Sequence, residues 1–64
     1  MLAVSVVIKN DMYINDLLSL ANEHGIKYSL RKNVANGTQF VFNFKEGEEK
    51  EKNAFYDAIP VEWI

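Results

Sequence analysis

The chain has 64 residues, which is enough for one domain spanning residues 1–64 and leaves few residues for a deep pocket. Hydrophobic residues make up 48% and charged residues 25%, as in folded globular proteins, which argues against disorder of the whole chain. A net charge of −2 argues against tight binding to duplex DNA, and the absence of cysteine excludes disulfides and thiolate metal sites.

Residues 2–8 form a short apolar run that predicts a β-strand, because β-branched residues dominate it. Bulky side chains alternate with smaller ones, and the bulky set is expected to face the core: Leu2, Val4, Val6 and Ile8. Lys9 follows at once, so the run is too short for a signal peptide or a membrane span. Together with the missing cysteines, this favours a cytoplasmic protein without a membrane partner.

The next segment, up to about His24, predicts a helix. Asn10 or Asp11 can cap its start, because either side chain accepts hydrogen bonds from the free N–H groups of the first turn. Gly25 is expected to end it in a left-handed conformation, with Ile26 following as in a Schellman ending. One apolar stripe at helical spacing is expected to face the core: Ile14, Leu17, Leu18 and Ala21.

Two alternating segments separated by a turn predict a β-hairpin. In the first, an apolar side is expected to face the core and a polar side to face away: Ile26, Tyr28 and Leu30 against Lys27, Ser29 and Arg31. The turn is expected over residues 33–37, with Asn36-Gly37 supplying positive φ angles. The second segment runs from Thr38 to Phe44 and gathers three aromatic residues on one side: Phe40, Phe42 and Phe44.

Residues 45–53 are polar or charged except for one glycine. Two Glu–Lys pairs in this part of the chain have the i, i+4 spacing that supports a helix, so we expect a second helix over about 48–58. A polar loop followed by a strand at 54–59 is the alternative. Pro60 ends whichever element precedes it, and residues 61–64 are expected to form a short edge strand.

The order strand, helix, strand, strand, helix and short strand predicts an α+β fold. The right-handed crossover rule and the hairpin together place strand three between strands one and two and antiparallel to both. We therefore expect a small ferredoxin-like βαββα(β) sandwich, with a three- to four-stranded antiparallel sheet and two helices on one face. A shared fold of this kind does not by itself imply a function.

The three phenylalanines of the second hairpin segment raise the question of base stacking, because RNA-recognition modules place aromatic residues on the third strand of such a sheet. Residues 36–41 match the glycine and the Phe-Val pair of that signature but lack its basic residue, and Thr38 stands where an aromatic is needed. Turning the phenylalanines outward would also bury Gln39 and Asn43 without partners. We therefore expect the three rings to lie in the core.

The same alternation of inward-facing and outward-facing side chains leaves the opposite face of the sheet open to solvent or to a partner. Val7 and Val41 are expected to form a small apolar spot there. Lys9, Lys27 and Arg31 are expected to form a basic corner of the same face. These five residues are candidates for binding.

Other residues are candidates on chemical grounds. Tyr56 on the second helix and Trp63 near the end of the chain are candidate interface anchors, because aromatic residues are enriched at binding hot spots. A clamp on the edge of the core is the alternative role for Trp63. His24, at a helix end, is expected to be structural. We expect no metal and no cofactor, since one histidine without cysteine cannot complete a zinc site and the three glycines are too far apart for a phosphate loop.

These patterns favour a non-catalytic protein-interaction module, such as an inhibitor, adaptor or regulatory protein of phage or mobile-element type. It would bind another protein through its sheet edge, its open face or its acidic second helix. An exposed edge strand also invites pairing with a second copy into a homodimer. The alternative is a single-stranded nucleic-acid-binding domain that uses four basic residues, Lys9, Lys27, Arg31 and Lys32. An enzyme would need a cluster of catalytic groups that the sequence does not show.

Overall fold

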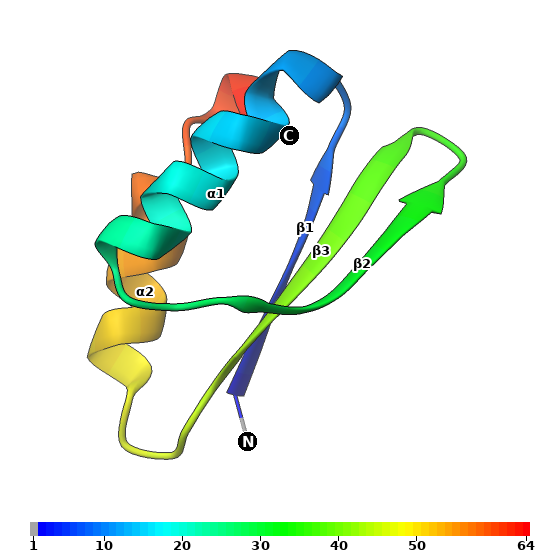
Figure 1. Cartoon of the computed structure of the whole chain (residues 1–64). Helices are drawn as coiled ribbons and strands as arrows, with labels where there is room; N and C mark the ends of the chain where they lie inside the picture. Colours follow the sequence, from blue (N-terminus) through cyan, green and yellow to red (C-terminus); the bar gives the residue numbers. More distant parts are fainter. Residues whose placement is uncertain (1) are drawn as a thin grey trace.

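The computed structural model of the chain describes residues 2–64. Its elements in chain order are β1 (Leu2–Ile8), a 3-10 turn (Asp11–Tyr13), α1 (Ile14–Glu23), β2 (Tyr28–Val34), β3 (Gly37–Phe44), α2 (Glu49–Ala58) and a second 3-10 turn (Val61–Trp63). The strand order in the sheet is β1-β3-β2, and β3 runs antiparallel to both neighbours. The predicted α+β class with strand three in the centre is confirmed, and both helices lie on one side of the sheet (Figure 1).

Helix α1 ends where Gly25 predicts, but it begins at Ile14, later than predicted, with Tyr13 as an N-cap that makes no side-chain hydrogen bond. The Asn10 side chain accepts a hydrogen bond from the Met12 N–H at 3.1 Å, so Asn10 caps the 3-10 turn that leads into the helix. At the other end Gly25 adopts a φ of 70°, and the Ile26 N–H donates to the Ala21 carbonyl at 2.9 Å. This is the predicted Schellman ending, and it directs the chain out of the helix toward β2.

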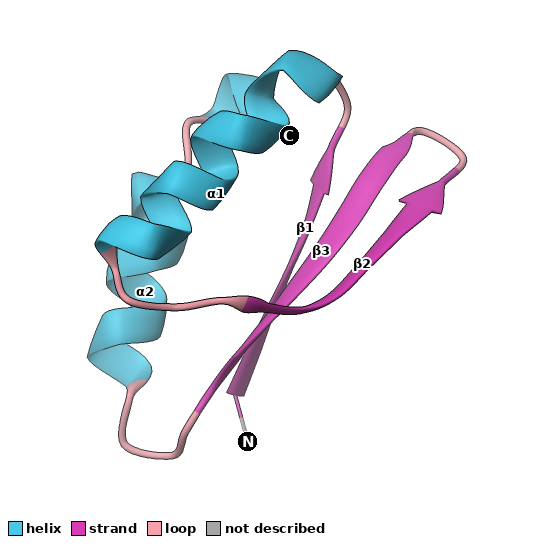
Figure 2. Cartoon of the chain, viewed as in Figure 1, coloured by secondary structure: helices cyan, strands magenta, loops and turns pink. Residues whose placement is uncertain are grey.

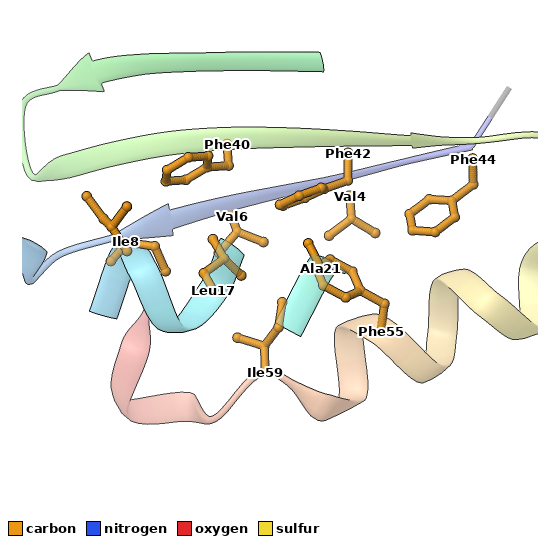
Figure 3. Close-up of a cluster of buried hydrophobic side chains, with 11 residues drawn as sticks. Val4, Val6, Ile8, Leu17, Ala21, Phe40, Phe42, Phe44, Phe55 and Ile59 are labelled. Carbon is orange, nitrogen blue, oxygen red and sulfur yellow. The ribbon is translucent and has the colours of Figure 1, made fainter. Parts of the chain in front are cut away.

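The core lies between the sheet and the two helices (Figure 3). Strand β3 contributes three phenylalanine rings to it, all from the side of the strand that faces the helices. Phe40 and Phe42 are 0% exposed, whereas Asn43 on the opposite face is exposed. The predicted parity of β3 is therefore confirmed. The other buried apolar residues are Val4, Val6, Ile8, Ile14, Leu17, Ala21, Phe44, Phe55 and Ile59.

The hairpin turn differs from its prediction. The strands pair up to Val34 and Gly37, so the turn consists of Ala35 and Asn36, and Asn36 does not adopt a positive φ. Gly37 has another role. A Cβ atom on it would overlap the carbonyl oxygen of Ile8 at the end of β1. The glycine is needed because the backbones of β1 and β3 approach closely there.

The charged segment before Pro60 is a helix, so the alternative of a loop followed by a strand is wrong. The Glu48 carboxylate accepts a hydrogen bond from the Lys45 backbone N–H at 2.6 Å, which ties the start of α2 to the loop before it. Phe55 is the buried residue of α2, and its ring centroid lies 4.8 Å from that of Phe42. Ile59 is extended, as the residue before a proline prefers, and the helix ends there.

The predicted fourth strand at residues 61–64 is wrong, because residues 61–63 form a 3-10 turn. The Trp63 ring stacks on Tyr13 with 5.9 Å between ring centroids. This contact holds residues 61–63 beside the first 3-10 turn, in the layer of the helices (Figure 1).

Candidate interaction surface

Strand β2 is the least covered element of the fold. It has a strand neighbour on one side only, and six of its seven residues are exposed while Val34 is half-buried. Helix α2 packs against β1, at the opposite edge of the sheet (Figure 2). The backbone N–H and C=O groups along the outer side of β2 are therefore available to another chain.

A β-bulge changes which side chains of β2 face the helices. Tyr28 lies opposite Phe42, but Leu30 lies opposite Val41, so Ser29 is an extra residue in the ladder. Because directly paired residues of antiparallel strands share a face, Leu30 lies on the open face beside Val41. The prediction that Leu30 enters the core is wrong, and its side chain is 41% exposed. Nothing in the local alternation of residue types signalled this.

The bulge moves the next residue to the opposite side as well. Arg31 pairs with Phe40, so it lies on the side facing the helices. The prediction that Arg31 lies on the open face is therefore wrong. Its guanidinium carbon is 5.3 Å from the centroid of the Phe40 ring, a cation–π distance. Lys32 pairs with Gln39 and lies on the open face. The two adjacent cations therefore emerge on opposite faces of the same edge strand.

Polar side chains on the open face bond to one another around Val41. The Ser29 hydroxyl donates to the Val41 carbonyl at 3.2 Å and accepts from the Asn43 amide at 2.7 Å. On the other side of β3, the Gln39 amide donates to the Ser5 hydroxyl at 2.8 Å. These bonds link all three strands and pair polar groups with one another within the face, next to the exposed Leu30 and Lys32 of β2.

Charge is divided between the hairpin and the helices. Residues 24–45 carry four cations, Lys27, Arg31, Lys32 and Lys45, and no acidic residue. All nine acidic residues of the chain lie outside this stretch, and eight of them lie in residues 11–23 and 46–58, which contain the two helices. The β2 edge is therefore locally basic although the protein is acidic overall.

We call the exposed edge and its flanking side chains the β2 surface, which comprises Lys27, Tyr28, Leu30, Arg31, Lys32 and Val41. Comparison of the chain with family models, with curated proteins and with solved structures finds no match.

The structure brings together only some of the predicted site residues. Val7 pairs with Gln39 and lies diagonally across the open face from Val41. Lys9 follows β1 at the turn end of the hairpin, whereas Lys27 precedes β2 at the other end. With Arg31 on the opposite face, the predicted basic corner does not form as one patch on the open face.

The aromatic candidates lie away from the β2 surface. Tyr56 is 50% exposed and lines a hollow of about 250 Å³ between β1 and α2, whose other lining residues are Ala3, Val4, Ser5, Lys52 and Asn53. Trp63 is half-buried against Tyr13, which favours the clamp role. His24 packs edge-on against Phe55 with 5.7 Å between ring centroids, in keeping with a structural role.

Among residues 2–64, no three of the His, Asp and Glu side chains gather in a group that could hold a metal ion. None of the helices in this range is both long enough and apolar enough to cross a bilayer. A second hollow, of about 550 Å³, is lined by four consecutive residues, 43–46, and is therefore a groove beside one segment rather than an enclosed pocket.

Proposed function

We propose that this protein is a non-catalytic interaction module, acting as an inhibitor, adaptor or regulatory protein, and that it binds another protein through the β2 surface. The observation that carries the proposal is the exposure of β2 along its outer edge and on both faces. An edge strand of this kind can accept an extended segment of another chain by backbone hydrogen bonding. Leu30 and Val41 then provide apolar contacts beside the added strand.

Exposure favours β2 over β1 as the binding edge, because six of the seven residues of β2 are exposed whereas three residues of β1 are buried. The order of elements and the β1-β3-β2 sheet agree with a ferredoxin-like arrangement that stops after its second helix, and we include that assignment in the proposal. Residues of α2 and of β1 line the hollow at the β1 side of the sheet. Strand β2 lies at the other edge of the sheet.

A single-stranded nucleic acid is less well matched to this surface. The three phenylalanines of β3 are buried and cannot stack on bases, and Tyr28 lies edge-on against Phe40 with 5.4 Å between ring centroids. The open edge presents carbonyl groups as well as N–H groups, and phosphate offers no donor to those carbonyls. A peptide backbone offers both acceptors for the N–H groups and donors for the carbonyl groups of this edge.

Site-specific photocrosslinking in the native host tests the proposal. A photoreactive phenylalanine analogue at position 30 is expected to capture one protein reproducibly. The matched control carries the analogue at Met12, which is 67% exposed on the helical side of the molecule, and is expected to capture little. Capture from position 12 but not from position 30, or capture of nucleic acid from position 30, would contradict the proposal.

A further inference from the structure

Building on the proposed function, we infer that the segment bound by β2 is an extended acidic peptide, which adds to the sheet as a fourth strand with a carboxylate on each of its faces. Two features of the β2 surface carry this inference. The first is the pair of cations that the strand itself carries, one on each face. The second is the repulsion between like charges that opposes pairing of β2 with a second copy.

Arg31 and Lys32 define the charge that a neighbouring strand meets. Because successive residues of a strand point to opposite faces, Arg31 meets the partner on the side facing the helices and Lys32 meets it on the open face. Contact with Phe40 holds the Arg31 guanidinium near the sheet. Residues 24–45 contain no acidic side chain that would neutralise either cation locally.

Leu30, the residue before Arg31, also contributes to what a bound strand meets. Leu30 lies on the open face and is 41% exposed, next to Val41. A bound strand therefore meets, in order, an apolar side chain on the open face, a cation on the helix side and a cation on the open face. The complementary segment has two consecutive acidic residues beside an apolar residue, which precedes them if the segment runs parallel to β2 and follows them if it runs antiparallel.

The same charges disfavour pairing of β2 with a second copy. A two-fold antiparallel pair centred on Arg31 would set this residue opposite itself, with Lys32 of both copies close by. Like charges directly opposite each other destabilise a strand pair.

Selection from a displayed library of random linear peptides tests the inference, with the whole protein as bait. We expect the selected peptides to be enriched in Asp and Glu next to a β-branched or other apolar residue. In ¹⁵N-labelled protein, their addition should shift the amide signals of residues 28–34. Raising the salt concentration should weaken binding, because the pairs are solvent-exposed.

Two double variants with the same change in net charge separate the sites. Arg31→Glu with Lys32→Glu is expected to weaken binding of the selected peptides about tenfold or more. Lys50→Glu with Lys52→Glu, on α2, should leave it unchanged. Circular dichroism establishes that both double variants remain folded.

The possible results separate this inference from the function on which it rests. Peptides that shift residues 28–34 but show no acidic enrichment, and that bind both double variants equally, would overturn the acidic partner and leave the β2 surface as the binding site. Peptides that shift only α2, or a library that yields no binder, would overturn both. An oligothymidylate that binds more tightly than every selected peptide, or sedimentation showing a β2-dependent dimer, would also overturn the inference.

Discussion

Phe55 anchors the charged helix α2 to the core, and its replacement tests how that helix is held. It is the buried residue of α2, it is 0% exposed, and its ring lies 4.8 Å from Phe42 and 6.3 Å from Phe44 between centroids. Truncating a buried phenylalanine to alanine costs about 3–5 kcal/mol. A domain of this size is stabilised by only about 3–5 kcal/mol in total. Phe55→Ala is therefore expected to be largely unfolded at room temperature, with α2 and the sheet lost together.

A milder variant and an exposed neighbour make this prediction quantitative. Phe55→Leu keeps an apolar side chain and should lose about 1–1.5 kcal/mol, or about 5–10 °C in Tm. Tyr56→Ala, at a position 50% exposed, should change stability by less than about 0.5 kcal/mol. Guanidinium denaturation followed by the fluorescence of Trp63, the single tryptophan, measures all three. A Phe55→Ala variant as stable as the wild type, or a Tyr56→Ala variant equally damaged, would refute the reasoning.

Two further predictions concern the backbone. Gly37→Ala should cost about 2 kcal/mol or more, because its Cβ would overlap the Ile8 carbonyl, whereas Gly25→Ala has open space around it and should cost about 1 kcal/mol from its φ of 70° alone. Equal losses in thermal denaturation would show that the close approach is absent. Asn10→Ala should lose about 1 kcal/mol with the cap, while Asn15→Ala, on the exposed side of α1, should be neutral or slightly stabilising. A neutral Asn10→Ala variant in circular dichroism melting would show that the cap does not hold the helix.

The central part of the fold could be predicted because local pattern and burial agree there. In β1 and β3 the bulky side chains recur at every second residue, and the alternative parity would bury Gln39 and Asn43. One face of each strand is covered by helices, so the sequence has to specify which residues lie on it. The capping of the turn before α1 by Asn10 and the end of α1 at Gly25 were predictable for a similar reason, since both residues satisfy backbone needs that depend only on their immediate neighbours.

The candidate surface could not be predicted in the same way. Strand β2 alternates between apolar and polar residues like a half-buried strand, but neither of its faces is covered, so burial does not enforce the register. The bulge at Ser29 shifts the register by one residue, which brings Leu30 to the open face and Arg31 to the other. The prediction of a strand at residues 61–64 failed for a different reason. The stacking of Trp63 on Tyr13 joins residues fifty positions apart, and no local pattern reveals such a contact.

The bulge in β2 is the feature on which the interaction surface depends, and nuclear Overhauser effects measure it directly. With selectively labelled methyl groups, the Leu30 methyl protons are expected to show contacts to the Val41 methyls and none to Leu17. The Arg31 side chain is expected to show contacts to the Phe40 ring. Contacts from Leu30 to Phe40 or Leu17, with Arg31 beside Val41, would contradict the account and place the apolar side of β2 in the core.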